Sequence, residues 1–329
     1  MFQQAGKLVV DNIDRAHTEK KRLQPQFFMA VIVGDLQEID RLIELGVDPN
    51  AVGDEGLTAV QLCTEQAHLL VLKHLLRHRN VNCNPHGKEL NGDSPLMAAV
   101  ALNRNPFVDL LLQHGADPNI TNNFGRTPLH EAVTKQNIEM VGQLLFAKAN
   151  PNVEDVFGNT PLSWSLIEYP CREMATLLLK WGANPNQHVV RPQPLLTELT
   201  LNCHSAEALG MVELLAAHKA DMNVVNSISG QSALHMVSIT GYLPLAELLL
   251  NLGAAQSLKD RSGRTPLDLA IQHGQADLVA FYKERNSLLK DAMGSTCLVT
   301  DRKSSEAAVA GRKPRNVRFS KHHATESED

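Results

Sequence analysis

The fold is decided by the stretch Gly125-Arg126-Thr127-Pro128-Leu129-His130, because its Thr-Pro-Leu core returns at a fixed interval along the chain. The copies that begin at Ser94, Thr127 and Thr160 are 33 residues apart, and so are those that begin at Ser232 and Thr265. A constant period of this length is typical of repeat proteins, in which each unit packs on its neighbours. The sequence therefore predicts a stacked array with an extended binding surface, and not a single core around a catalytic pocket.

One unit, residues 125–157, shows the expected local structure. Pro128 suits the first turn of a helix, where the missing N–H costs nothing. Apolar residues at spacings of three and four then mark two short helices, the first with Leu129, Ala132 and Val133 and the second with Ile138, Val141, Leu144 and Leu145. Turn-forming residues, Ala149-Asn150-Pro151-Asn152, end the second helix. The order is turn, helix, helix, turn.

This pattern closely resembles the ankyrin repeat, through Thr127-Pro128-Leu129-His130, the paired leucines of the second helix, and a closing Gly-Ala-Asp-x-Asn phrase. The phrase stands at 46–50, 115–119 and 182–186. The resemblance covers about eight units between Pro25 and Leu288. It implies an all-α solenoid of helix-turn-helix units with turn or hairpin fingers along one edge. We expect an N-terminal extension over residues 1–22 with a helix as one option, the solenoid over 23–290, and a disordered tail over 291–329.

Several units depart from the repeat pattern. Unit two has a longer turn after its second helix, and unit five carries an extra residue near Tyr169-Pro170. Unit six has about five inserted residues around Leu201 to Ala206, and insertions in repeats map to loops, so a bulge or bend is expected there. The first and last units look like caps, whose outer faces meet water.

Composition excludes several classes of protein. A net charge of −5 argues against general affinity for nucleic acid or for an anionic membrane. The first residues lack the apolar segment of a secretory signal, and no uncharged stretch is long enough to span a bilayer. Five scattered cysteines suit a reducing compartment. We expect a cytoplasmic protein, with the nucleus as a further location.

A search for catalytic motifs predicts no enzyme, no cofactor and no metal site. There is no phosphate-binding loop, and His130-Glu131 is followed by Thr134 where a zinc protease would have its second histidine. His74 and His78 are four residues apart with Cys83 and His86 beyond them, but helix-end surface histidines are the simpler explanation. His130 and His235 are expected to hydrogen-bond the backbone of the adjacent finger.

The resemblance places a protein partner against the fingers and the first helices, on the concave surface of the stack. Phe124 and Phe157 precede the opening glycines of two units and would lie on neighbouring fingertips. Exposed aromatic residues are typical of interface anchors, although each ring has the alternative of folding onto its own finger. The other candidate binding residues are Arg126, Asn159 and Ile167. The two tryptophans, Trp164 and Trp181, are expected to pack structurally.

The tail carries a second resemblance. Arg315-Asn316-Val317-Arg318-Phe319 is similar to the docking motif of type-1 protein phosphatase regulators, in which a basic residue precedes two alternate apolar side chains. An extended segment of this kind adds to a sheet edge while Val317 and Phe319 fill pockets. Ser304 and Ser320 follow basic residues and are candidate phosphorylation sites.

The sequence therefore predicts a non-enzymatic adaptor or scaffold. Recruitment of type-1 protein phosphatase through Arg315, Val317 and Phe319 is one function open to its tail, and a solvated basic patch or a weak nuclear-import signal is the other. A transcriptional cofactor or a ubiquitin-ligase adaptor on the same scaffold is the alternative. A ligase-recruiting box would need an apolar helical segment after the repeats, and Leu288 to Val299 is short and polar.

Overall fold

The computed structural model describes residues 22–85, 91–186, 194–201 and 206–288. The chain divides into two compact units, Met1–Gln275 and Ala276–Asp329. In the second unit the described residues, 276–288, are helical. The binding surface and the side-chain cluster described below lie in the first unit.

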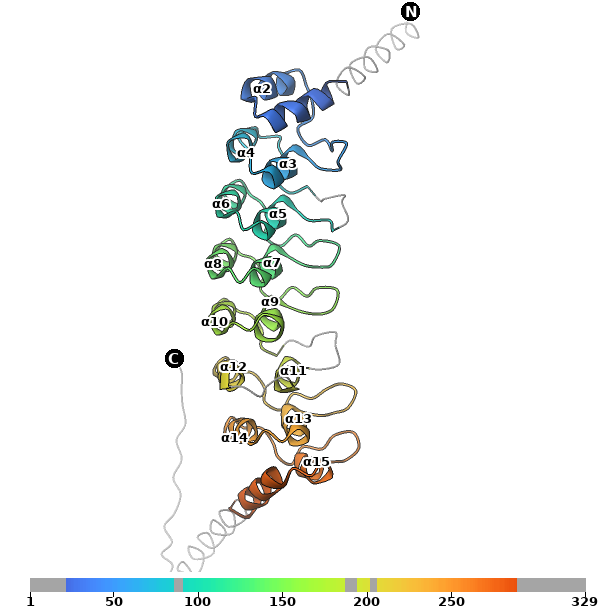
Figure 1. Cartoon of the computed structure of the whole chain (residues 1–329), viewed down its shortest axis with the longest axis vertical. Helices are drawn as coiled ribbons and strands as arrows, with labels where there is room; N and C mark the ends of the chain where they lie inside the picture. The colour runs from blue at the N-terminus through green and yellow to red at the C-terminus, as the bar shows by residue number, and fades with distance from the viewer. Residues whose placement is uncertain (1–21, 86–90, 187–193, 202–205, 289–329) are drawn as a thin grey trace, which may run out of the picture. The chain divides into compact units, whose positions relative to one another are not determined.

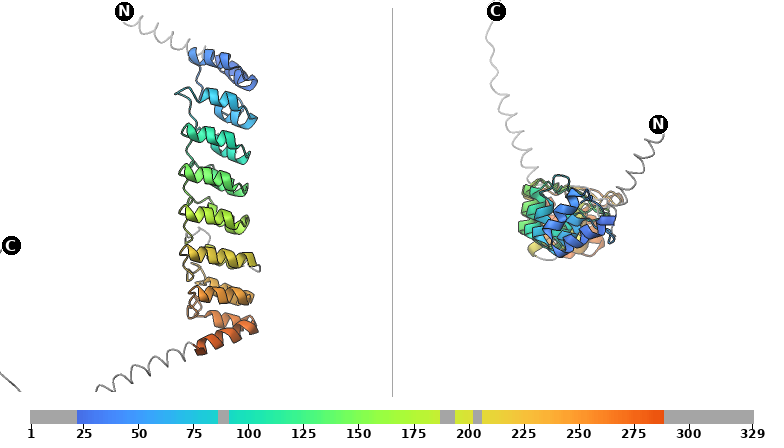
Figure 2. Two further views of the ribbon diagram at one scale, coloured as in Figure 1. Left: turned by 90° about the vertical axis from the view of Figure 1, so that its left-hand side faces the viewer. Right: turned by 90° about the horizontal axis from the view of Figure 1, so that it is seen from above.

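The first unit is a stack of helix pairs, with the first helices of successive pairs in one column and the second helices in another (Figures 1 and 2). Fingers project from the column of first helices (Figure 1). Isolated β-bridges, Val52 with Thr58 and Val225 with Ser232, are the β-pairing found among the described residues. The predicted all-α solenoid is confirmed for this part of the chain. In chain order the pairs are residues 22–33 with α2 (Leu36–Glu44), α3 (Ala59–Gln66) with α4 (Leu69–Leu75), α5 (Pro95–Ala101) with α6 (Asn105–Gln113), α7 (Pro128–Thr134) with α8 (Ile138–Phe146), α9 (Pro161–Ser163) and the π-helix η1 (Trp164–Glu168) with α10 (Arg172–Lys180), α11 (Leu195–Leu201) with α12 (Ala206–Ala217), and α13 (Ala233–Thr240) with α14 (Leu243–Asn251), followed by α15 (Pro266–Gln272).

The Thr-Pro-Leu phrase, or a variant of it, caps the first helices α3, α5, α7, α9, α13 and α15. Thr160 accepts a hydrogen bond from the backbone N–H of Ser163, at 3.2 Å, and the Ser163 hydroxyl lies 2.9 Å from the Thr160 nitrogen and accepts from it. The proline at the first helical position needs no N–H there. The residue three places after the cap differs from unit to unit, and Gln61, His130, His235 and Asp268 all reach back in the same way.

The interior of each pair is built from small and medium apolar side chains. In α7 and α8, the residues Leu129, Ala132, Val133, Met140, Val141, Leu144 and Leu145 are all buried. Ile138, expected in this set, is half-buried, and Met140 takes the fully buried position instead. The first helices also pack on one another from unit to unit, α3 on α5 and α5 on α7.

A row of asparagines joins each unit to the next, and we call it the asparagine ladder. Asn119 shows the arrangement: its side-chain amide donates to the carbonyl of Lys148, at 3.3 Å, and its side-chain oxygen accepts from the N–H of Asn150, at 2.7 Å. One side chain therefore satisfies two backbone groups at the end of the following second helix. The members of the ladder are Asn50, Asn84, Asn119, Asn152, Asn186 and Asn223.

The extra residue of unit five is absorbed by the π-helix η1. The N–H of Tyr169 donates to the carbonyl of Trp164, at 2.8 Å, which is the wider spacing of a π-helix. The longer turn of unit two includes residues 86–90 and the insertion of unit six includes 202–205, all outside the described residues. The bend expected in unit six stays a prediction, as do the boundaries expected at residues 22 and 290.

Candidate protein-binding surface

Two neighbouring fingers, around residues 122–126 and 155–159, are held by short polar turns. The Asp155 carboxylate accepts from the N–H groups of Phe157, at 2.9 Å, and of Asn159, at 2.8 Å. Asn122 plays the same part for Phe124 and Arg126. The tip residues are therefore presented by a rigid turn, and their side chains are not used to build it.

The fingers are also joined to one another through their main chains. The N–H of Val156 donates to the carbonyl of Phe124, at 2.9 Å. The same bond recurs from Asn123 to Asn91 and from Arg261 to Ser229. Adjacent fingertips are thus held in a fixed relative position.

Apolar side chains are exposed at these two tips. Phe124 is 40% exposed, Phe157 54% and Val156 58%. Both phenylalanine residues are exposed, which favours the alternative in which their rings are not folded onto their own fingers. Val156 is an addition that the sequence analysis did not single out, although it lies beside Phe157.

Arg126 is fixed beside this apolar patch. Its guanidinium carbon lies 4.5 Å from the ring centre of Trp164 and 5.7 Å from that of Phe124. Its Nε is buried and has no hydrogen-bond partner among the described residues. Trp164, buried as expected, is in turn held edge-on against His130 at 5.6 Å between ring centres. The guanidinium of Arg126 is therefore oriented by the rings of Phe124 and Trp164, and this arrangement joins two repeats.

The other two expected binding residues have different positions. Asn159 donates from its side chain to Asp155, at 3.3 Å, so it serves its own finger. Ile167 is half-buried in the π-helix. Trp181, expected to pack, is 46% exposed after α10.

The buried histidines take the structural role predicted for them. His130 Nδ1 accepts from the N–H of Thr127, at 3.1 Å, and its Nε2 donates to the carbonyl of Asn159 in the next finger, at 3.2 Å. His235 bonds Ser232 and the carbonyl of Arg264 in the same way. Burial lowers the pKa of His130 to about 4, against the opposing effect of the bond to Asn159, and burial also lowers the pKa of His235.

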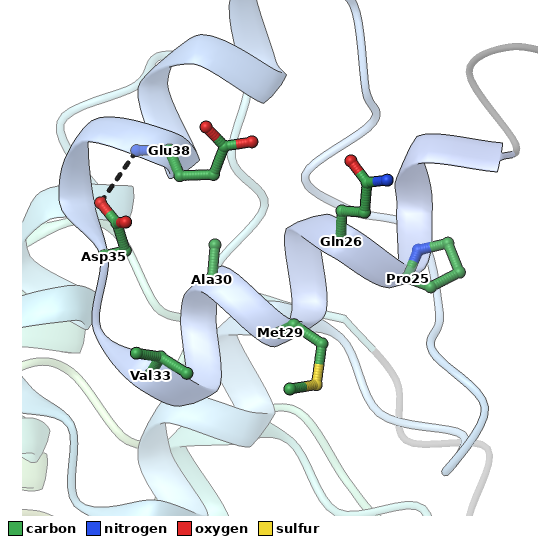
Figure 3. Close-up of a pocket in the computed structure, with 7 residues that line it drawn as sticks. All are labelled: Pro25, Gln26, Met29, Ala30, Val33, Asp35 and Glu38. Atoms are coloured by element: carbon green, nitrogen blue, oxygen red, sulfur yellow. Dashed lines mark hydrogen bonds between the residues drawn. The ribbon is translucent and has the colours of Figure 1, made fainter.

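One hollow in the surface lies on the first helix pair (Figure 3), and a second lies between that pair and the finger that follows it. Met29 and Val33 line one of them and are exposed, and its polar groups include Asp35, which accepts from the N–H of Glu38 as a helix cap. The outer face of this first, capping unit is therefore more apolar than a face that only meets water requires. No convergent set of reactive groups lies in it.

Cys83 is buried and its thiol donates to the carbonyl of His114, while His86 lies outside the described residues. The tail residues Ser304, Arg315, Val317, Phe319 and Ser320 also lie outside them. Among the helices that the structure describes, none combines the length and apolar character that a bilayer crossing needs.

Comparison with known proteins supports this architecture. The ankyrin-repeat family model (three copies) matches residues 27–122, 101–188 and 202–286. The ankyrin repeat protein YahD of Escherichia coli (strain K12) is 32% identical over 105 residues, which are 30% of this chain and 51% of YahD. The B-cell lymphoma 3 protein homolog of Mus musculus is 35% identical over 111 residues, 33% of this chain and 23% of that protein. The chain thus spans about half or less of the curated relatives that it matches.

A solved structure gives a longer match. The ankyrin repeat domain of Bcl-3, described as a unique member of the IkappaB protein family, is similar with a TM-score of 0.59 and 27% sequence identity. The match covers 67% of this chain and 95% of that domain.

Proposed function

Because the chain belongs to the ankyrin-repeat family, we propose that it is a non-enzymatic adaptor whose fingertips around Phe124 and Phe157 bind a protein partner. The observation that supports this proposal is the apolar patch on two adjacent fingers with Arg126 fixed beside it. Family and fold are typically those of non-enzymatic interaction domains.

The patch has the properties of an interface centre. Aromatic and arginine side chains dominate binding energy when a partner covers them. The fingers are held by main-chain bonds, so little order has to be gained on binding. The guanidinium of Arg126 is suited to pair with a carboxylate. The favoured partner is a protein segment that presents apolar side chains next to an acidic residue.

A pair of matched variants tests the proposal. Phe124→Ser/Phe157→Ser removes the patch, and Phe146→Ser removes a phenylalanine that is 82% exposed at the end of α8, in the other helix column. Loss of an anchor costs about 2 kcal/mol or more, or roughly a 30-fold loss of affinity. In a quantitative pull-down with each full-length variant, the amount of bound partner protein should fall for Phe124→Ser/Phe157→Ser and stay unchanged for Phe146→Ser. Equal recovery from both variants would refute this assignment of the surface.

We further propose that the tail segment with Val317 and Phe319 recruits type-1 protein phosphatase, on the basis of its motif. Val317→Ala/Phe319→Ala in the full chain should abolish recovery of the phosphatase, and a phosphate on Ser320 should weaken it by placing negative charge beside the docking residues. Equal recovery of the phosphatase with the intact and the variant chain would refute this proposal and leave the proposal about the fingertips unaffected.

A transcriptional cofactor is the second candidate, because the similarity to Bcl-3 fits it as well. The phosphatase-recruiting adaptor and the transcriptional cofactor differ in their expected location in the cell. We propose a cytoplasmic protein that also enters the nucleus. Imaging of the tagged full chain checks this, and a strictly nuclear signal would favour the cofactor.

A further inference from the structure

Three side chains that bind metals well converge on the outer helices of the first two units. Asp40 lies in α2, His74 lies in α4, and His78 follows α4. The Nε2 atoms of His74 and His78 lie 2.8 Å and 3.0 Å from the same oxygen, Oδ1 of Asp40. The three ligand atoms are all within 4.8 Å of one another.

The donor set has the chemistry of a zinc site. Two imidazole nitrogens and one carboxylate oxygen are ligands that zinc uses, at about 2.0–2.2 Å each. In a tetrahedral site such bonds place neighbouring ligand atoms roughly 3.4 Å apart, so each nitrogen would move away from the carboxylate oxygen by about 0.5 Å. A cation between them would take the place of the protons that now lie in the two hydrogen bonds, with a small movement of the rings.

The cluster is also accessible. The side chains of His74, His78 and Asp40 are 18%, 28% and 43% exposed, so a cation could enter and keep a water molecule as a further ligand. The two rings meet edge to face, with centres 5.7 Å apart, and both nitrogens remain directed at the carboxylate.

The nearby thiol of Cys83 is not part of the cluster. Burial raises the pKa of Cys83, which keeps its thiol protonated and bonded to the carbonyl of His114. The donor set is therefore two nitrogens and one oxygen.

We propose that Asp40, His74 and His78 bind one zinc-type divalent cation, which links the first repeat to the second. The sequence analysis predicted no metal site, because helix-end surface histidines are the simpler explanation of His74 and His78. Asp40 stands 34 residues before His74, and only the stack brings it to them. A bound cation would tie α2 to α4 at the end of the stack.

Titration calorimetry of the full chain with zinc chloride tests the proposal. We expect one Zn²⁺ bound at this site in the intact chain, and at least a tenfold loss of affinity in His74→Gln, in His78→Gln and in Asp40→Asn. Asp40→Asn keeps the shape of the side chain and removes its charge. The matched control is His68→Gln, at the start of the same helix, which should bind zinc as the intact chain does.

A second readout does not depend on how well the variants fold. In the intact chain, Zn²⁺ should shift the imidazole proton resonances of His74 and His78, and Co²⁺ should give the visible absorption of a four-coordinate site. Circular dichroism establishes that each variant remains folded. The proposal is overturned if the intact chain binds no zinc, if folded His74→Gln and His78→Gln bind it unchanged, or if zinc leaves the two imidazole resonances unmoved.

Discussion

Acidification should weaken the middle of the solenoid through His130. The imidazole is fully buried between Thr127 and the carbonyl of Asn159 in the next finger. Its Nδ1 accepts a hydrogen bond there, and a protonated ring has no acceptor to offer. Burial, only partly opposed by the bond to Asn159, accordingly lowers the pKa of His130 to about 4.

The expected loss follows from the gap between the folded and unfolded pKa values. An unfolded histidine has a pKa of about 6.5, so between this value and about 4 the unfolded chain binds more protons than the folded chain. Stability therefore falls as the pH falls through this window. Between pH 7.5 and pH 5.0 the contribution of His130 amounts to about 2 kcal/mol.

The chain itself supplies a matched uncharged substitute. Gln61 holds the equivalent position in unit two, where its side-chain oxygen accepts from the N–H of Thr58, at 3.0 Å, and its amide donates to the carbonyl of Asp93, at 3.2 Å. His130→Gln should keep both kinds of bond and remove the titration.

Urea unfolding at pH 7.5 and pH 5.0 measures the difference. The fluorescence of Trp164, whose ring centre lies 5.6 Å from that of His130, reports on this region in a Trp181→Phe background. All other titrating groups are shared by the two proteins, so the difference between their pH dependences isolates His130, provided that their denaturant slopes agree. An equal loss of stability on acidification in both proteins would contradict the reasoning.

Three further substitutions in and around α8 have expected effects on the thermal melting temperature and on urea unfolding. Gly142→Ala should stabilise the fold by about 1 kcal/mol, because a methyl group there meets no atom within 4 Å and alanine favours a helix, and a lower melting temperature would count against this. Lys148→Gly should also stabilise by about 1 kcal/mol, since Lys148 adopts φ 68°, where Gly115 stands in the preceding unit, and unchanged stability would show that the strain is absent. Asn119→Ala should cost about 1–2 kcal/mol by removing two bonds of the asparagine ladder. Asn105→Ala, which among the described residues removes a single side-chain bond, to Glu139 at 3.5 Å, should cost much less.

The part of the structure that the sequence could predict is the part built from neighbours in the chain. The cap at Thr127 and the return bond from His130 depend on a spacing of three residues, so a motif shows them directly. The bond from His130 to the next finger was also predictable, because the period of 33 residues places the fingers next to one another.

Contacts between particular side chains of different units were not predictable. Arg126 lies over Trp164, and Asp40 lies between two histidines, only because the stack brings separate units together. The extra residue of unit five could be counted in the sequence. A loop or a π-helix could accommodate it, and only the structure, through the bond from Tyr169 to Trp164, shows that it is a π-helix. The exposure of Trp181 depends on what the neighbouring units leave uncovered.

The main-chain bonds between fingers have a consequence for how such a protein diverges. The bond from Val156 to Phe124 uses a backbone N–H and a backbone carbonyl, so it does not depend on which side chains stand at these two positions. Mutations at the fingertips are therefore constrained mainly by partner binding. A change at Asn119 or His130 must first leave the chain able to fold. Lineages of this chain should therefore vary most at the tips and least at the residues beneath them.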